Sequence, residues 1–505
     1  MGRTQIRSWL EHLPDRTFDY SSSLEQKTLV GAWKICLESK SSKPLFYHDD
    51  SWISRSEFLE KTNVIAGRLN SAGLITGDRV LISGKTSVDL AAAHVACLRL
   101  GLVVIPVNGA YQKLELEHVV RDAQPRAALV DHDNWADWIS DIDKNILVKT
   151  TAVDLPDGPV PQLDDVTPDA PALIVYTSGT TGRPKGAVHT QASLLAGVHS
   201  VALAWRWIES DRLLLCLPLF HMHGLGLGLH GTLFVGGSAV LQTKFSSEAV
   251  LSELIKHDCS MFFGVPTMYH RLVESPGAEV LNSLRLCVSG SAPLSADLHQ
   301  RLKNNIGVDV LERYGTTETL MLISNPYNGE RRSGSVGIPL PGVEVILDEV
   351  SGEILVRGPS VFDGYWGNEQ ATIEALIDGW FHTGDLAEID EDGYLSIVGR
   401  AKDLIITGGF NVYPREVEDV LIVHNDIAEI AVAGIQSEEW GEEVAAWVVP
   451  VQNSTCPTVS ELRDFAMDLL TDYKIPRRVI GVSSLPRNSL GKVLRYELKE
   501  TTAYE

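Results

Sequence analysis

Short apolar runs rich in β-branched residues alternate with helical stretches along this chain of 505 residues. The clearest example begins with Arg79–Ser83, which we predict as a buried strand. A helix is predicted over Val88–Leu100 and a second strand over Val103–Val107. A strand, a helix and a further strand in this order form a βαβ unit. The alternation therefore predicts an α/β fold.

The spacing of these elements changes twice along the chain. From about Ser333, shorter strands and turns replace the helices, and after Gly399 the α/β pattern returns with a helix predicted over Arg415–Val423. A chain of this length holds about two to four domains. We therefore predict a large N-terminal domain over residues 1–399 and a small C-terminal domain over residues 400–505.

The segment Leu213–Thr243 contains no Asp, Glu, Lys or Arg. It is longer than the roughly 20 residues that a membrane-spanning helix needs. However, Pro218, three histidines and six glycines interrupt it, and such residues break a continuous apolar helix. We predict a strand, a loop and a buried helix here, with no membrane span.

The chain is acidic, with 43 Lys and Arg against 66 Asp and Glu and a formal net charge of −23. This surplus of negative charge argues against nucleic acid or an anionic membrane surface as a partner. The segment Lys474–Glu500 differs, because it contains seven basic residues against two acidic ones. We expect this local positive charge to face an anionic substrate.

The six cysteines lie far apart and form no Cys-x-x-Cys pair. This spacing favours reduced thiols over disulfides or a zinc site. The first residues, Met1–Leu13, contain no apolar core of signal-peptide length. We therefore expect a cytoplasmic protein.

The segment Tyr176–Gly186 combines glycine, hydroxyl and lysine residues between an apolar strand and a helix beginning near Thr190. Glycines let backbone N–H groups approach an anion, hydroxyl groups donate hydrogen bonds to it, and a lysine adds positive charge. We predict a phosphate-binding loop. Its candidate ligands are Thr177, Ser178, Gly179, Thr180, Thr181, Gly182 and Lys185.

This loop and five later segments resemble, in the same order, the motifs of the adenylate-forming superfamily. That superfamily comprises acyl- and aryl-CoA synthetases, the adenylation domains of peptide synthetases and beetle luciferases. The resemblance implies a large domain of α/β subdomains plus a distorted β-barrel, followed by a small mobile α/β domain. It also implies ATP, Mg²⁺, coenzyme A and a small carboxylic acid as ligands. The five segments are Ser289–Pro293, Tyr314–Glu318, Thr383–Asp385, Gly399–Asp403 and Pro486–Lys492.

The resemblance also implies a role for each matching residue. Three are implied as catalytic, with Thr317 at the α-phosphate, Glu318 on Mg²⁺ and Lys492 as the catalytic lysine. Asp385 is the implied ligand of the ribose hydroxyls, and Lys402 is the implied pivot of a hinge. The implied nucleotide-binding residues outside the phosphate loop are Gly290, Ser291, Ala292, Tyr314, Gly315, Thr316, Asp385, Arg400 and Lys402.

The reaction implied by the resemblance has two steps. A carboxylate attacks the α-phosphate of ATP to give an acyl-adenylate and pyrophosphate, and the thiol of coenzyme A then displaces AMP. A carboxylate is already ionised at pH 7, so the first step needs no general base. It does need neutralisation of charge, because an anion must approach a polyanion. Lys492, Glu318 with Mg²⁺ and the phosphate loop match that need.

Two residues are candidates for contact with the acid. His223 follows the start of the charge-free segment and would donate to a substrate oxygen, although a structural histidine explains it nearly as well. Arg285 precedes Leu286 on a predicted strand and would pair with a second carboxylate of the substrate. A purely structural arginine is an equal alternative for Arg285.

Further segments resemble the malonyl-CoA synthetase branch, whose members activate malonate and often methylmalonate. This chain departs from that branch at Thr316, where methionine is common, and in its glycine-rich segment Gly224–Gly231. The alternatives are a ligase for a short or medium monocarboxylic acid, an enzyme that loads a carrier-protein thiol, and a nucleotide-binding regulator without activity. The segments that resemble the branch are Phe263–Tyr269, Leu311–Tyr314 and Asn325–Gly337.

Overall fold

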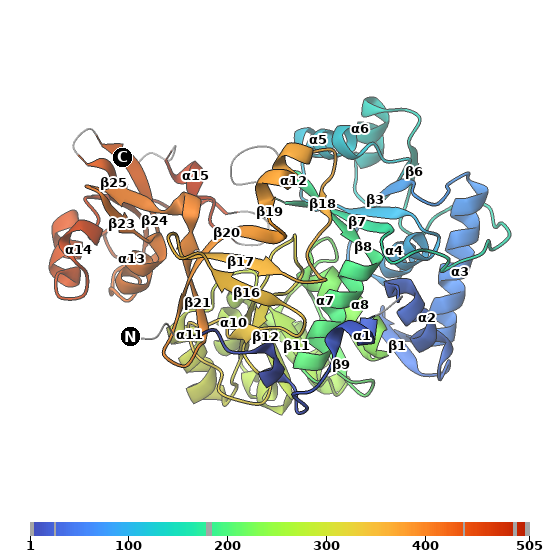
Figure 1. Ribbon diagram of the computed structural model, residues 1–505, viewed down its shortest axis with the longest axis horizontal. Coiled ribbons are helices and arrows are strands. Elements are labelled where there is room, and N and C mark those ends of the chain that lie inside the picture. The colour runs from blue at the N-terminus through green and yellow to red at the C-terminus, as the bar shows by residue number, and fades with distance from the viewer. Residues whose placement is uncertain (1–4, 25–26, 178–183, 438–439, 488–491, 500–505) are drawn as a thin grey trace. The chain divides into compact units, whose positions relative to one another are not determined.

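The computed structural model describes residues 5–24, 27–177, 184–437, 440–487 and 492–499. The chain forms two compact units (Figure 1). Of the described residues, the larger unit comprises those in Gln5–Val345 and Val356–Phe381, and the smaller comprises those in Ile346–Leu355 and from His382 onward. Helices and strands are mixed in both, as the alternation in the sequence predicts.

A seven-stranded sheet in the larger unit contains the predicted βαβ unit. Its strands β3 and β4 are parallel neighbours, and the helix α4 (Val88–Arg99) connects them. Both α4 and β4 end one residue before the predicted ends, a normal uncertainty for sequence-based boundaries. The strand order is β18 (Gly364–Tyr365), β8 (Lys185–Thr190), β7 (Pro171–Thr177), β4 (Val103–Pro106), β3 (Arg79–Ser83), β5 (Ala127–Val130) and β6 (Leu147–Lys149).

A nine-stranded sheet also lies in the larger unit, and its central strands are parallel. Parallel strands of this kind are buried on both faces, which explains their continuous apolar sequences. The strand order is β15 (Ile338–Pro339), β14 (Ile323–Ser324), β13 (Leu311–Tyr314), β12 (Leu286–Ser289), β11 (Met261–Gly264), β9 (Arg212–Leu215), β10 (Ser238–Leu241), β1 (Pro44–His48) and β2 (Ser51–Ser54).

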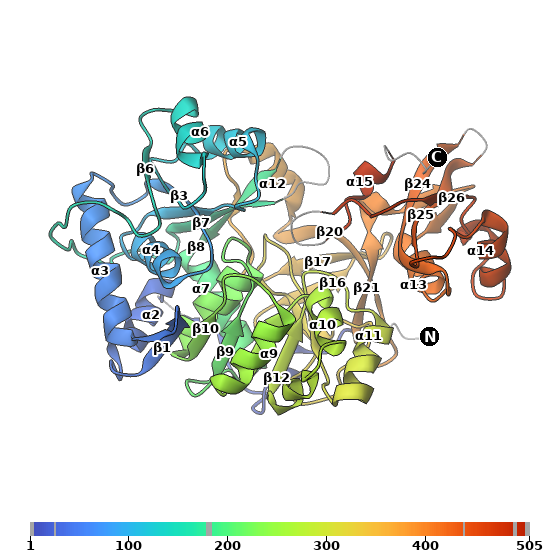
Figure 2. The same ribbon diagram turned by 180° about the vertical axis from the view of Figure 1, so that it is seen from behind.

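Helices cover both sheets of the larger unit. α7 (Gln191–Ala204) contacts β8 of one sheet, and α8 (His230–Val235) contacts both α7 and β10 of the other sheet. Figure 2 shows three more helices together in front of β12. These are α9 (Ser247–Lys256), α10 (Pro266–Val273) and α11 (Ala296–Arg301); the other helices of this unit are α1 (Tyr20–Leu24), α2 (Leu29–Glu38), α3 (Arg55–Ser71), α5 (Lys113–Ala123), α6 (Trp135–Ile142) and α12 (Glu369–Ala375).

The charge-free segment forms β9, a loop, a π-helical turn over His223–Leu229, α8 and β10. This is the predicted succession of strand, loop and buried helix. Every residue of the π-helical turn is buried, which explains why the segment excludes charged side chains. No helix among the described residues is both long and apolar enough to cross a membrane.

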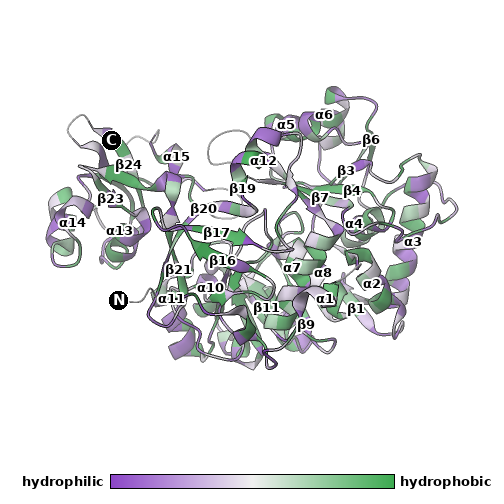
Figure 3. Ribbon diagram, in the orientation of Figure 1, coloured by the Kyte–Doolittle hydropathy of each residue, from purple (hydrophilic) through white to green (hydrophobic). Residues whose placement is uncertain are grey.

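The smaller unit has its own five-stranded sheet and apolar core, and the predicted helix at Arg415–Val423 appears as α13 (Pro414–Leu421). Figure 3 shows β24 as largely hydrophobic, consistent with its place in that core. The strands are β23 (Phe410–Val412), β22 (Ile405–Thr407), β25 (Gly441–Pro450), β24 (Ile427–Ser437) and β26 (Arg478–Gly481), and the remaining helices are α14 (Val459–Ala466) and α15 (Arg495–Leu498).

A further five-stranded sheet forms from the region of short strands and turns predicted after Ser333. Its strand order is β16, β17, β20 and β19, and β21 pairs with β20. Among the described residues these pairings leave the sheet open, so a closed barrel stays a prediction. The strands are β16 (Glu344–Leu347), β17 (Glu353–Arg357), β20 (Trp380–Ile389), β19 (Leu376–Ile377) and β21 (Leu395–Arg400).

Candidate active site

Two of the sequence motifs follow neighbouring parallel strands of the nine-stranded sheet. β12 ends at Ser289 and β13 ends at Tyr314, and Ser289 is paired with Glu312 across the two strands. Residues after the carboxyl ends of adjacent parallel strands lie at the same edge of a sheet, where α/β proteins bind ligands. The predicted groups Gly290–Ala292 and Tyr314–Glu318 are therefore brought together.

The turn after β12 needs a glycine at its first position. A Cβ atom on Gly290 would lie 2.3 Å from the guanidinium carbon of Arg313, so any side chain there would displace that arginine. Ser291 adopts a left-handed conformation with φ of 69°, which costs energy for a residue other than glycine. Ser291 and Ala292 are half-buried. Strain of this kind is common at binding sites.

The turn after β13 is fixed by contacts on both sides of Thr317. The Nε2 atom of His189 lies 2.7 Å from the carbonyl oxygen of Thr317, and the backbone N–H of Thr316 donates to the Oγ1 atom of Thr319 at 3.2 Å. A Cβ atom on Gly315 would lie 2.2 Å from the carbonyl oxygen of Leu320. These contacts hold Tyr314–Glu318 as a tight, half-buried turn.

The carboxylate of Glu318 meets a tyrosine that sequence reasoning did not find. The hydroxyl of Tyr365, on β18, donates to the Oε1 atom of Glu318 at 2.9 Å, and the ammonium of Lys185 lies 4.6 Å from the centre of the Tyr365 ring. Burial, together with the nearby Glu318 carboxylate, raises the pKa of the Tyr365 hydroxyl. The Tyr365 hydroxyl therefore stays protonated and is the hydrogen-bond donor to Glu318.

Glu318 is chemically suited to hold Mg²⁺. This ion is usually bound by one or two carboxylates together with substrate phosphates, and it keeps several water molecules. Among the described residues, no group of three or more His, Cys, Asp or Glu side chains forms a closed metal cage. A single carboxylate at the sheet edge fits an ion that arrives with a nucleotide.

The predicted phosphate loop joins two antiparallel strands, because β7 and β8 pair from Pro171 with Thr190 up to Thr177 with Lys185. Thr177 and Lys185 thus form the base of the loop. Five of its candidate ligands lie outside the described residues, namely Ser178, Gly179, Thr180, Thr181 and Gly182.

The helix α5 contacts both ends of that loop. The hydroxyl of Tyr176, one residue before Thr177, donates to the carboxylate of Asp122. The Nε2 atom of His118 lies 2.8 Å from the carbonyl oxygen of Pro184. His118 and Asp122 are four residues apart and therefore share one face of the helix.

Arg285 lies at the start of β12, at the end away from Gly290. Its Nε atom donates to Oδ1 of Asp211 at 2.6 Å, and a terminal nitrogen donates to Oδ2 at 2.5 Å. It also donates to the carbonyl oxygen of Trp205 at 3.1 Å. The carboxylate that Arg285 binds thus belongs to the protein, and the geometry favours the structural alternative of the two that the sequence left open.

His223 lies beside Ser291, with 3.4 Å between its Nδ1 atom and the serine Oγ. It is buried, and its Nε2 atom has no hydrogen-bond partner among the described residues. Burial, reinforced by the positive charge of Arg313, holds the pKa of His223 well below 6.5. The imidazole is therefore neutral at pH 7 and offers an unsatisfied nitrogen to a ligand.

Arg313 on β13 is the second residue that sequence reasoning missed. Its side chain is only 4% exposed, and two of its guanidinium nitrogens have no hydrogen-bond partner among the described residues. Burial lowers the pKa of Arg313 to about 9, partly offset by Glu312. A buried charge without a satisfied partner is costly. Arg313 therefore makes this part of the site attractive to an anion.

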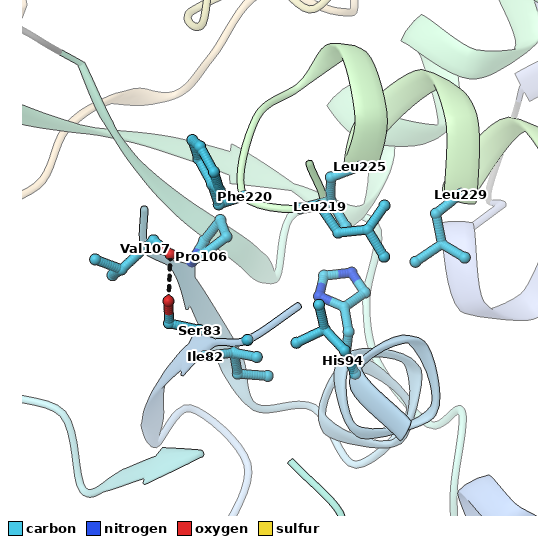
Figure 4. Close-up of a pocket in the computed structure, with 11 residues that line it drawn as sticks. Ile82, Ser83, His94, Pro106, Val107, Leu219, Phe220, Leu225 and Leu229 are labelled. Carbon is cyan, nitrogen blue, oxygen red and sulfur yellow. Dashed lines mark hydrogen bonds between the residues drawn. The ribbon is translucent and has the colours of Figure 1, made fainter. Parts of the chain in front are cut away.

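A small, mainly apolar pocket lies beside the π-helical turn (Figure 4). Leu219, Leu225 and Leu229 of the charge-free segment form one wall. The polar lining groups are engaged or neutral: the Ser83 hydroxyl donates to the carbonyl oxygen of Val107 at 2.7 Å, and burial lowers the pKa of His94 to about 3. The pocket thus offers no charged group to a ligand.

The smaller unit gathers the other predicted residues. Asp385 on β20 is paired with Arg400 on β21, and the Oδ1 atom of Asp385 lies 2.9 Å from the Nε atom of Arg400. Lys402 follows in a short exposed turn. Burial, with the positive charge of Arg400 nearby, lowers the pKa of Lys492 to about 8. Residues that are more than a hundred positions apart in the sequence therefore form one cluster.

The chain matches known proteins over most of its length. The AMP-binding enzyme family matches residues 35–366, and the C-terminal domain of AMP-binding enzymes matches residues 416–492. A probable CoA ligase of Humulus lupulus, CCL8, is 35% identical over 96% of this chain and 89% of its own length. The malonate–CoA ligase of Arabidopsis thaliana is 35% identical over 85% of this chain and 79% of its own length.

Solved structures agree with these relatives. ATP-bound MatB from Rhodopseudomonas palustris superimposes with a TM-score of 0.88 at 36% identity, covering 94% of this chain and 99% of that one. The chain belongs to the AMP-binding enzyme family. Within that family it is an acid–CoA ligase, an acyl-CoA synthetase that uses ATP, Mg²⁺ and coenzyme A.

Proposed function

We propose that this ligase activates malonate or methylmalonate and produces malonyl-CoA or methylmalonyl-CoA through an acyl-adenylate. The observation that carries the proposal is the buried Arg313, whose guanidinium lies against Gly290 and near His223. A dicarboxylate has one carboxylate to react and a second to be bound. Arginine binds a carboxylate through two parallel hydrogen bonds, which gives both strength and orientation.

The comparisons support a CoA ligase more firmly than any one acid. The malonate–CoA ligase of Arabidopsis thaliana, by its name, favours malonate. However, relatives of similar identity act on other acids by their names, such as a feruloyl-CoA synthase at 34% and an oxalate–CoA ligase at 33%. We therefore base the choice of a dicarboxylate on the buried positive charge of Arg313.

In the proposed first step, the chain binds and orients two anions. Arg313 and the unpartnered Nε2 atom of His223 would hold the distal carboxylate, so that the other carboxylate faces the α-phosphate near Thr317. The Mg²⁺ held with ATP at Glu318 supplies neutralisation of phosphate charge. The ammonium of Lys492 would stabilise the negative charge that develops on the phosphate oxygens as the carboxylate attacks the α-phosphate. No side chain needs to remove a proton, because the acid is already ionised.

The second step needs a different arrangement, since the thiol must approach the acyl carbon. We propose a division into a large domain over residues 1–399 and a small domain over residues 400–505, with Lys402 at the pivot. In this scheme Arg400 and Asp385 bind the ribose of the nucleotide in both steps.

All six cysteines are free thiols in the structure, which supports a reducing, cytoplasmic location.

A substrate panel tests the proposal. Release of AMP that depends on coenzyme A would be measured with malonate, methylmalonate, acetate and butyrate, and again with a carrier protein as thiol acceptor. We expect kcat/KM for malonate or methylmalonate to exceed that for the monocarboxylates by at least about 100-fold, the scale of a bidentate charged contact. Preference for a monocarboxylate would overturn the proposed substrate, and activity with the carrier protein alone would overturn the choice of thiol.

A further inference from the structure

Tyr365 occupies an unusual position between the two charged groups at the base of the larger unit's site. Its hydroxyl donates to Glu318, and its ring faces the ammonium of Lys185. The first contact is with the proposed magnesium ligand and the second with the proposed phosphate ligand. Nothing in the reaction described above uses Tyr365, and no motif in the sequence marked it.

The backbone around Tyr365 fixes it between the same two structures. β18 pairs with β8, so that Tyr365 lies opposite Ala187 just beyond the phosphate loop. On the other side, the N–H of Phe362 donates to the carbonyl oxygen of Glu318 at 2.8 Å. The four residues from Phe362 to Tyr365 therefore connect the strand leaving the loop with the turn that holds Glu318.

The side chain of Tyr365 has little freedom to leave this position. Its ring packs against Phe362 with the two ring centres 4.9 Å apart in an edge-to-face arrangement. Its backbone N–H donates to the Oγ1 atom of Thr372 at 2.9 Å. The preceding Gly364 has a φ of 143°, and a Cβ atom there would lie 2.7 Å from Thr372. A side chain fixed in this way can hold its partner's orientation.

The hydrogen bond engages one of the two oxygens of the Glu318 carboxylate. Glu318 is half-buried, and among the described residues no hydrogen bond is recorded to its Oε2 atom. A glutamate side chain has three rotatable bonds, and a metal ligand must be held in place before the ion arrives. With Oε1 engaged by Tyr365, the second oxygen keeps a defined direction.

We propose that Tyr365 is a positioning residue for Glu318, which it orients for the binding of Mg²⁺ together with ATP, while its ring contact orients Lys185. The inference rests on the proposed role of Glu318 as the magnesium ligand. Tyr365 acts through Glu318 and Lys185, so we expect its effect on metal and nucleotide affinity. The effect should be separable from a general effect on folding.

The test measures the affinity of the enzyme for ATP by calorimetry, once in the presence of Mg²⁺ and once with excess EDTA. Tyr365→Phe removes only the hydroxyl and keeps the ring over which Lys185 lies. We expect this variant to bind ATP about five- to tenfold more weakly with Mg²⁺, the scale of the net contribution of one hydrogen bond. Metal-free binding should stay within about twofold of the wild type, because the ring contact with Lys185 remains.

A second variant separates the two contacts of Tyr365. Tyr365→Leu also removes the ring, so it should weaken metal-free binding as well. Tyr47→Phe is the matched control, since its hydroxyl donates to the exposed Asp50 at 3.1 Å far from the site. The thermal midpoint of each variant shows whether it is folded.

The results distinguish this inference from the role of Glu318 itself. If Tyr365→Phe leaves both affinities unchanged, or weakens both equally, the positioning role is wrong. If Glu318→Gln has no effect on the Mg²⁺ dependence, then the assignment of the metal ligand fails instead. If both variants weaken Mg²⁺-dependent binding and the double variant is no weaker than Glu318→Gln alone, the hydroxyl acts through Glu318 as proposed.

Discussion

At the scale of single residues, two arginines show how similar sequence contexts lead to different roles. Both belong to neighbouring strands of the same sheet, but Arg285 directly precedes β12, whereas Arg313 lies within β13, near its end. Arg285 has Asp211 as a partner, whereas Arg313 has two nitrogens without one among the described residues. The difference depends on which end of the strand faces the site.

Arg285→Ala is expected to reduce stability and leave substrate choice unchanged. Asp211 is only 3% exposed, so removing Arg285 leaves a buried carboxylate without two of its hydrogen bonds. The loss should be about 2–3 kcal/mol in unfolding free energy, because Arg285 itself is partly exposed. Chemical denaturation measures the loss, and the ratio of activity on malonate to activity on butyrate should not change. A selective loss of malonate activity would restore Arg285 as a substrate ligand.

Lys492 predicts a pH dependence of the first step. Burial lowers its pKa to about 8, so its ammonium is charged below pH 8 and loses its proton as the pH rises through that value. Since adenylation needs the charge, kcat/KM for ATP in pyrophosphate exchange should fall above about pH 8. This parameter reports ionisation of the free enzyme.

Two variants check that the alkaline decrease comes from Lys492. Lys492→Arg keeps a charge at every accessible pH, so the decrease should disappear even if the rate is lower. Lys492→Ala should suppress adenylation but spare thioester formation from a supplied acyl-adenylate. An unchanged decrease in the Arg variant would mean that another group controls it.

At the scale of elements, the helix α5 fixes both ends of the phosphate loop. Asp122 and His118 contact the residues before and after it, Tyr176 and Pro184. We expect Asp122→Ala to raise KM for ATP about three- to tenfold, the scale of the net contribution of one hydrogen bond. Steady-state kinetics at several ATP concentrations measures this change.

The same helix provides a matched control for Asp122. Glu117→Ala removes a carboxylate that pairs with Arg121 on α5 at 2.8 Å, and it should leave KM for ATP unchanged. Equal effects of the two substitutions would mean that α5 acts only through its general stability.

The sequence predicts elements well where local pattern is sufficient. The βαβ unit from Arg79 is present, and the charge-free segment from Leu213 is buried as expected. Contacts between distant segments cannot be predicted from local pattern. Tyr365 lies 47 residues after Glu318, and the pairing of β18 with β8 that brings it there has no local signal. Arg313 stood within a recognised motif, but its unsatisfied charge depends on neighbours from other strands.

At the scale of the whole molecule, the net charge of −23 raises the question of which positive charges are available to ATP. The sequence predicts that the basic segment Lys474–Glu500 supplies them. Most of the basic residues between Lys474 and Glu500 are paired with acidic residues of the smaller unit. The positive charge available to ATP therefore depends on individual buried groups such as Lys492 rather than on a basic surface. Among the described residues the ion pairs of this segment are Lys474 with Glu416, Arg477 with Asp472, Arg478 with Glu443, Arg487 with Glu429, and Arg495 with both Glu418 and Asp403.

The central claim is that this CoA ligase selects a dicarboxylic acid through Arg313. The most direct test is the ratio of kcat/KM for malonate to that for butyrate, in the wild type and in Arg313→Met, which keeps the bulk but removes the charge. We predict that the variant loses malonate activity by at least about 100-fold while butyrate activity changes by less than about threefold. Equal losses for both acids, or unchanged malonate activity, would contradict the claim.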